Sequence, residues 1–199
     1  MTIDAMQHQL REHLEKIVPL TDAEFAFVLA RFSNKRFKKH QFLVQEGGPV
    51  PYAYFVAAGL LKLVYTDGTG KQHLLSFAME DWWETDFRAY HTQTPATLSL
   101  ECLEDTSVWC LALADYHQLC AELPAMVRFF LQKSTLGSIA AQQRLLSLLT
   151  TSAQERYDQL LAQFPALAQR VTKTLLASYL GVSRETLSRL AASRDLPHR

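Results

Sequence analysis

The fold of the C-terminal part of the chain is decided by the stretch VTKTLLASYLGVSRETLSRLAASR, residues 171–194. Thr172 is a suitable N-cap for a first helix, because its hydroxyl can accept a hydrogen bond from the first turn. The apolar side chains that we expect to face inward on this helix are Leu175, Leu176, Tyr179 and Leu180. Gly181 then supplies the positive φ of a tight turn, Val182 fills the space between the helices, and Ser183 caps a second helix. The stretch therefore predicts two helices joined by a short turn, as in a helix-turn-helix.

The second of these helices separates apolar from polar side chains. Leu187 and Leu190 are spaced to point inward. The side chains left facing outward are Arg184, Glu185, Ser188 and Arg189. A guanidinium can donate two hydrogen bonds to guanine, and a carboxylate can accept one from cytosine, so this face predicts sequence-specific reading of double-stranded DNA. With the groups suited to phosphate contacts, the predicted DNA-binding residues are Thr172, Lys173, Ser183, Arg184, Glu185, Thr186, Ser188 and Arg189.

The distribution of charge agrees with this prediction. Across 199 residues, 20 basic side chains balance 20 acidic ones. From Arg170 onward, however, six basic residues oppose two acidic ones, a local balance of plus four. We therefore expect positive potential at the C-terminal end, where a nucleic acid would bind, and a dimer would double it.

The rest of the chain reads as an α+β protein. Two short helices are expected within the first thirty-odd residues, and Thr21 with Glu24 forms a capping-box signature between them. From about residue 35 to 113, short segments rich in β-branched and aromatic residues alternate with turn signals, of which DGTG at 67–70 is the clearest. Seven or eight strands fit this range. The spacing predicts an antiparallel β-roll, or jelly roll, flanked by helices.

A long helix is predicted to follow over residues 124–149, because its pattern contains no internal proline. At 1.5 Å per residue it would be about 39 Å long, more than a small domain needs to cover its own sheet. Apolar and small residues recur along it as in a coiled-coil seam. The residues predicted to mediate homodimerisation are Val127, Phe130, Leu131, Ser134, Ser138, Ala141, Leu145 and Leu148. The alternative is a single wide helix buried within its own monomer.

The predicted organisation comprises a sensor domain at 1–122, a dimerisation helix at 123–150 and an all-α DNA-binding domain at 151–199. The boundary near residue 150 rests on Ser152 and Glu155, a second capping-box signature. No run approaches the roughly 20 apolar residues of a membrane span, and the polar start is unlike a signal peptide. We therefore expect a cytoplasmic protein that does not interact with membranes.

These residues resemble the Crp/Fnr family of transcription regulators. The segment Val171–Leu190 matches the helix-turn-helix of that family without a gap, including a Gly-x-Ser-Arg-Glu-Thr core. The stretch FLVQEGGPVPYAYFVAAGLLKLVY, residues 42–65, resembles a cyclic-nucleotide-binding-type β-roll. The resemblance is greatest to a compact subgroup, common in Bacteroidetes-like bacteria, with the patterns ERYxxLL and ASYLGVxxETLSR. It implies a homodimer that binds a near-palindromic site with Arg184, Glu185 and Arg189 as base readers, and it leaves a contact with RNA polymerase open.

The sequence departs from the family pattern in two places. Only nine residues follow Leu190, so we expect the family's β-hairpin wing to be absent. In the phosphate-binding cassette, the Gly-Glu and Arg-Ser pairs of cyclic AMP binders correspond here to Glu84, Thr85, Pro95 and Ala96. No arginine remains to neutralise a cyclic phosphate, and Glu84 would repel it by about 1 kcal/mol or more. We therefore expect that cyclic AMP is not the effector.

Other readings of the β-roll stay open at this point. The aromatic residues Trp82, Trp83 and Phe87 are candidates for lining a pocket for a small-molecule effector, although such residues more often belong to a core. The three cysteines form no CxxC pair, and the histidines lack the His-x-His spacing of cupin metal sites, so we expect no metal or cofactor and no enzyme. The alternatives to a regulator are a ligand-binding or protein-interaction module with a degenerate helix-turn-helix and, more remotely, a cupin-like enzyme.

Overall fold

The computed structural model describes residues 2–194. The chain divides into two compact units, Met1–Thr135 and Leu136–Arg199, each described here by itself. Residues 195–199, which include Asp195 and Arg199, lie outside the described part. They also make up most of the segment on which the expected absence of a wing depends.

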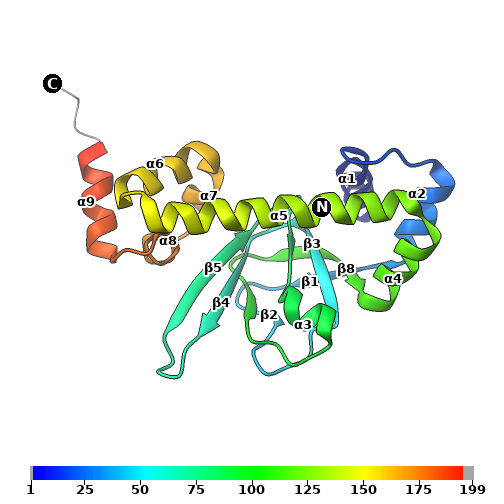
Figure 1. The fold of residues 1–199 in the computed structure, drawn as a ribbon, viewed down its shortest axis with the longest axis horizontal. Coiled ribbons are helices and arrows are strands. Elements are labelled where there is room, and N and C mark those ends of the chain that lie inside the picture. Colours follow the sequence, from blue (N-terminus) through cyan, green and yellow to red (C-terminus); the bar gives the residue numbers. More distant parts are fainter. Residues whose placement is uncertain (1, 195–199) are drawn as a thin grey trace. The chain divides into compact units, whose positions relative to one another are not determined.

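The first unit contains the predicted antiparallel β-roll (Figure 1). One four-stranded sheet has the order β1 (Phe32–Phe37), β8 (Thr106–Ala112), β3 (Tyr52–Ala58) and β6 (Trp83–Glu84). The other has the order β2 (Phe42–Val44), β7 (Ser99–Cys102), β4 (Leu61–Thr66) and β5 (Gln72–Ala78). Neighbouring strands in both sheets are antiparallel. The predicted α+β class and β-roll are therefore confirmed.

The strands form because alternate residues of both sheets face a shared apolar core. Val56 of β3, Leu61 of β4, Leu100 of β7 and Val108 of β8 all belong to this core and are fully shielded from solvent. Burial of this kind contributes about 25 cal/mol for each Å² of apolar surface removed from water. This core makes the β-roll a packed scaffold rather than an open barrel.

The predicted DGTG hairpin connects β4 and β5. Thr66 pairs with Gln72 at its base, and the Asp67 carboxylate accepts hydrogen bonds from the backbone N–H groups of Thr69 and Lys71. Gly70 has a φ of +83°, a conformation that glycine adopts without steric cost. The residues of the turn, Asp67 and Gly70, therefore fix the register of this hairpin.

Helices gather at one side of the β-roll (Figure 1). They are α1 (Ile3–Glu15), α2 (Asp22–Leu29) and α4 (Leu113–Glu122). A second apolar cluster holds them to the sheet; in it, Met6, Leu10 and Leu14 of α1 pack in a group that includes Phe55 of β3 and Phe129. The two expected N-terminal helices are confirmed.

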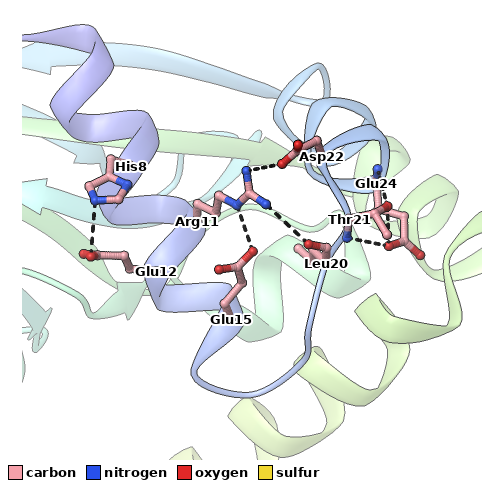
Figure 2. Close-up of polar contacts among 8 residues, drawn as sticks. All are labelled: His8, Arg11, Glu12, Glu15, Leu20, Thr21, Asp22 and Glu24. Carbon is pink, nitrogen blue, oxygen red and sulfur yellow. Dashed lines mark hydrogen bonds and ion pairs between the residues drawn. The ribbon is translucent and has the colours of Figure 1, made fainter.

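Figure 2 shows how polar contacts fix the connection between α1 and α2. The Arg11 guanidinium contacts Glu15 at 2.8 Å on its own helix and Asp22 at 2.7 Å at the start of α2. Thr21 and Glu24 form the predicted capping box, in which the Thr21 backbone N–H donates to the Glu24 carboxylate at 2.8 Å. The link between the two helices is therefore specified by local chemistry.

The long helix α5 (Pro124–Thr150) extends through the end of the first unit and the start of the second. Its first turns are held in the first unit, where Ala125, Met126 and Phe129 are buried. The predicted long helix is confirmed over almost the expected range.

A short helix, α3 (Phe87–Thr92), lies between β6 and β7 and is not predicted from the sequence.

The second unit adds four helices to the C-terminal part of α5. They are α6 (Ala153–Gln163), α7 (Pro165–Arg170), α8 (Lys173–Leu180) and α9 (Arg184–Arg194). Ser152 and Glu155 form the predicted capping box at the start of α6. The small core of this unit consists of Leu160, Leu167, Leu176, Ala177, Leu180 and Leu187.

Candidate nucleic-acid interface

The connection between α8 and α9 has the geometry that its sequence predicts. The Thr172 hydroxyl accepts a hydrogen bond from the Leu175 backbone N–H at 3.3 Å and so caps α8. Gly181 ends α8 in the left-handed region with a φ of +69°. The backbone N–H of Val182 then donates to the Ala177 carbonyl at 3.0 Å. This closing bond makes the turn tight and places α9 against α8.

Helix α9 begins with the predicted cap and is anchored by one leucine. The Ser183 hydroxyl accepts from the Thr186 backbone N–H at 3.1 Å. Leu187 is 1% exposed, whereas Leu190 is half-buried, so most of the anchoring comes from Leu187. Because one face of α9 is fixed in this way, the opposite face is free to contact a partner.

The exposed face of α9 carries the predicted base readers. Arg184, Glu185, Ser188 and Arg189 are all exposed. Residues 184 and 188, and residues 185 and 189, are four apart, so these four side chains form two adjacent rows on one face of the helix. The structure thus brings together the side chains that we expect to read bases.

The residues expected to contact phosphates are also accessible, with one exception. Thr172, Lys173 and Ser183 are exposed at the first turns of α8 and α9. Thr186 is half-buried, and its hydroxyl accepts from the Ser183 hydroxyl at 3.2 Å and from the Arg189 guanidinium at 3.4 Å. Its hydroxyl therefore orders the start of α9 in the free protein.

The electrostatics of this surface follow from the start of α9. The Glu185 carboxylate is stabilised by its own backbone N–H and by the Ser183 hydroxyl, which lower its pKa below the usual value. The residue is therefore an ionised hydrogen-bond acceptor at neutral pH, beside the cationic Arg184. A surface that combines donors and acceptors can discriminate between base pairs, whereas a uniformly basic one binds any phosphate backbone.

Two further arginines contact the end of α8, and no local sequence pattern distinguishes them from other arginines. The Arg144 guanidinium of α5 lies 3.7 Å from the centre of the Tyr179 ring and donates to the Tyr179 carbonyl at 3.0 Å. Arg156 of α6 donates to the Leu180 carbonyl at 3.0 Å and also to the Thr151 carbonyl. Both arginines therefore bind the C-terminal end of α8.

The residues predicted to mediate dimerisation occupy two environments. Val127, Leu131 and Leu145 are 44%, 66% and 59% exposed. The other exposed members of the predicted seam are Ser134, Ser138, Ala141 and Leu148. Phe130 differs, because it is half-buried and its ring packs 4.6 Å from that of Tyr116 within the same unit. Part of the α5 surface is thus used within the protomer, and most of the predicted seam is not.

The three aromatic residues of the candidate effector pocket, Trp82, Trp83 and Phe87, lie in different environments. Trp83 packs against Phe55, with ring centres 5.6 Å apart, and its indole N–H donates to His13 Nε2 at 3.2 Å. Trp82 packs against the core between the sheets, whereas Phe87 is 46% exposed. Both tryptophans are partly buried and pack against the apolar clusters, and their role in binding an effector stays a prediction.

The cassette region also differs from the expectation for Glu84. Its carboxyl group is buried, accepts a hydrogen bond from the Ser76 hydroxyl at 2.6 Å, and has its pKa raised by burial to about 7. The Glu84 carboxyl is therefore not an exposed negative charge facing a ligand, which differs from the repulsion of a phosphate that the sequence predicts. The expectation failed because the sequence does not show that Ser76 of β5 faces β6.

Asp86 supplies the negative charge at the start of α3 instead. This residue is 1% exposed, and its carboxylate accepts from the backbone N–H groups of Ala89, Thr97 and Leu98 and from the Thr97 hydroxyl. These hydrogen bonds lower the pKa of Asp86 despite its burial. Its position before a helical turn was the available sequence signal, since aspartate is a preferred N-cap.

Among residues 2–194, no three or more His, Cys, Asp or Glu side chains are grouped so that they could hold a metal ion. Within the same range, no helix has both the length and the hydropathy needed to cross a membrane.

Comparison with known proteins places this geometry in context. Residues 34–122 match the cyclic nucleotide-binding domain. No curated protein matches the chain. The structure resembles FixK2 from Bradyrhizobium japonicum, with a TM-score of 0.72 and 18% identity over 81% of this chain and 83% of that one.

Two other solved structures show the same likeness. The c-di-GMP responsive global regulator CLP of Xanthomonas campestris is 15% identical over 90% of this chain and 96% of its own, with a TM-score of 0.69. A protein from Eubacterium rectale described as a transcriptional regulator of the Crp/Fnr family is 13% identical over 87% and 83%, with a TM-score of 0.67. Residues 34–122 are therefore similar to a cyclic nucleotide-binding domain, and the chain has the fold of the Crp/Fnr family transcription regulators, the family that its sequence resembles.

Proposed function

We propose that the protein is a sequence-specific DNA-binding transcription regulator of the Crp/Fnr type. The observation that carries this proposal is the exposed face of α9, on which Arg184, Glu185, Ser188 and Arg189 project from a helix anchored by Leu187. In this reading α8 and α9 form a helix-turn-helix, and α9 enters the major groove.

The chemistry of each group assigns it a role in this complex. Arg184 and Arg189 donate to guanine O6 and N7, and Glu185 accepts from cytosine N4. Thr172, Lys173 and Ser183 contact phosphates, which fixes the register of the protein on the duplex without reading sequence.

We further propose that the protein acts as a homodimer joined along α5. Single exposed apolar residues are common on monomers, but many of them along one helix suggest an interaction surface. The surface available for pairing includes Val127, Leu131, Leu145 and Leu148 of the predicted seam, together with Leu136, Ile139, Leu146 and Leu149. Two copies of α9 would then bind half-sites about 34 Å apart on a near-palindromic sequence.

Cyclic AMP is not the effector in this proposal. The Asp86 carboxylate already binds one backbone N–H at the start of α3, that of Ala89, and those of Thr97 and Leu98 before β7. Pro95 stands where cyclic AMP binders have an arginine. A phosphate would have to displace a buried carboxylate that accepts four hydrogen bonds. Calorimetric titration with cyclic AMP is expected to show no binding, and saturable binding at micromolar concentrations would contradict this part of the proposal.

Selection of bound sequences from random duplex DNA tests the main proposal. The purified protein is expected to enrich one motif with two related halves, and to bind it about 10³-fold or more tightly than random DNA at physiological salt. Enrichment of no motif would instead favour an interaction module with a degenerate helix-turn-helix.

A further inference from the structure

Two guanidinium groups connect the C-terminal part of α5 and the start of α6 to the C-terminal end of α8. Arg144 reaches from α5 to the ring and the carbonyl of Tyr179. Arg156 bridges the Thr151 carbonyl, just beyond the end of α5, and the Leu180 carbonyl at the end of α8. A Cβ added to Gly181 would lie 3.6 Å from Leu148 of α5, so the turn lies close to the same helix. All of these residues belong to the second unit.

These contacts suit arginine for physical reasons. The last carbonyls of a helix have no partner within the helix and carry the negative end of its dipole. A guanidinium is planar and rigid, so it can donate to a carbonyl while stacking on an aromatic ring. Arg144 contacts both the ring and the carbonyl of Tyr179. Two contacts to one residue restrain the rotation of α8 about the α8 axis as well as the distance between α8 and α5.

We propose that Arg144 and Arg156 form a clamp that sets the angle between α5 and the DNA-reading helix pair. The clamp thereby sets which spacing of DNA half-sites the dimer accepts. This inference rests on the proposed function, because spacing has meaning only for a dimer that reads DNA. Arg144 and Arg156 are positioning residues in it, and neither contacts DNA.

The consequence can be measured on DNA of altered spacing. B-DNA completes a turn in 10 to 10.5 base pairs, so inserting two base pairs rotates one half-site relative to the other by about 70°. A dimer whose reading helices are held rigidly cannot follow this rotation and loses one of its two half-site contacts. A dimer with a loosened junction can follow it and loses less.

The test compares the wild type with Arg144→Met, which keeps an unbranched apolar side chain near Tyr179 but removes the donors and the charge. Arg128→Met is the matched control, because residue 128 is an exposed arginine on the same helix in the other unit. Affinities are measured for a single half-site, for the selected full site and for full sites with two base pairs added or removed.

We expect Arg144→Met to bind a single half-site within about twofold of the wild type. Its preference for the selected spacing should fall roughly tenfold, the effect expected from one lost hydrogen bond to a charged group. Arg144→Lys should restore part of this preference, and Arg128→Met should retain all of it. An unchanged spacing preference in Arg144→Met overturns the proposal, and so does an equal loss at the half-site and the full site.

Hydrogen exchange tests the clamp without DNA. The backbone N–H groups of Gly181 and Val182 donate within the turn that the clamp supports. In Arg144→Met, these amides should exchange faster while those of the β-roll do not change. If the wild type bound no DNA, the proposed function would fail, but hydrogen exchange would still test whether Arg144 supports the turn. Unchanged exchange of the Gly181 and Val182 amides in Arg144→Met would refute the clamp.

Discussion

Arg184 and Arg189 differ from Arg144 and Arg156 in where their charge is used. The first pair is exposed on α9, whereas the second pair donates to carbonyls at the end of α8. Within the protein, Arg189 donates one hydrogen bond, to the Thr186 hydroxyl of its own helix, so both exposed arginines still present donors to a partner. The second pair is committed to contacts between helices. The sequence predicts the role of the first pair from local spacing. It does not predict the second, because Arg144 meets Tyr179 across 35 residues of chain.

Replacing Arg184 by Ala tests the reading role. Removing a guanidinium that donates twice to guanine should weaken binding to the selected site by about 1 to 3 kcal/mol and relax the preference at one base-pair position. Folding should not change, because the side chain is exposed. Gel shifts with the selected site and with single-base variants measure the effect, and Arg88→Ala, an exposed arginine on α3, is the control. Loss of affinity without loss of base preference would reassign Arg184 to a phosphate contact.

Glu84 leads to a prediction about stability and pH. Burial raises its pKa from an ordinary 4.5 to about 7. A carboxyl with a raised pKa in the folded state stabilises the fold fully below pH 4.5, and this contribution is lost as the pH rises through about 7. The loss amounts to roughly 3 kcal/mol for a shift of this size.

Glu84→Gln should therefore be more stable relative to the wild type at pH 8 than at pH 5, because the amide carries no charge. Urea unfolding of both proteins across this range gives the difference directly. Taking that difference cancels His13, a buried histidine whose pKa burial lowers to about 4 and which titrates alike in both proteins. Glu46→Gln, at an exposed site, serves as the control. A constant difference between wild type and Glu84→Gln would show that the carboxyl is not destabilised by burial.

Among the secondary-structure elements, α5 is the one whose sequence had two readings. Met126 and Phe129 are buried in the first unit, while Leu131 and Leu145 are exposed, so the helix is only partly buried in its own protomer and dimerisation along it stays a prediction. Sequence periodicity predicted the existence and length of this helix, but not that Phe130 would pack within its own protomer. Helix α3 was missed because its six residues are too few to show a helical period.

The dimerisation proposal is tested by Leu145→Asp. A carboxylate at this exposed position should not affect the folded protomer, but it would be buried without a partner in the proposed interface. We expect the variant to be monomeric in analytical ultracentrifugation at concentrations where the wild type is dimeric. The control is Gln143→Asp, at an exposed position on the same helix outside the predicted seam. A Leu145→Asp protein that remained dimeric would place the interface elsewhere.

Along the entire chain, the order of the elements could be predicted from the sequence because each carries a local signal. Turn residues mark the β-roll, uninterrupted periodicity marks α5, and the caps at Thr172 and Ser183 mark the last two helices. The state of the ligand cassette was not readable, because it depends on Asp86 meeting backbone groups of Thr97 and Leu98 from another segment. Local chemistry thus predicts the elements, and long-range contacts decide what each site can bind.

The central claim is that α9 reads base edges in the major groove from a symmetric protein. Protection of guanine N7 from dimethyl sulfate on the selected duplex tests it most directly, because N7 lies in the major groove. We expect two protected clusters whose centres lie about 10 base pairs apart, and loss of protected guanines in Arg184→Ala and Arg189→Ala. Guanines that stay fully reactive in a saturated complex, or a pattern identical in both variants, would contradict it.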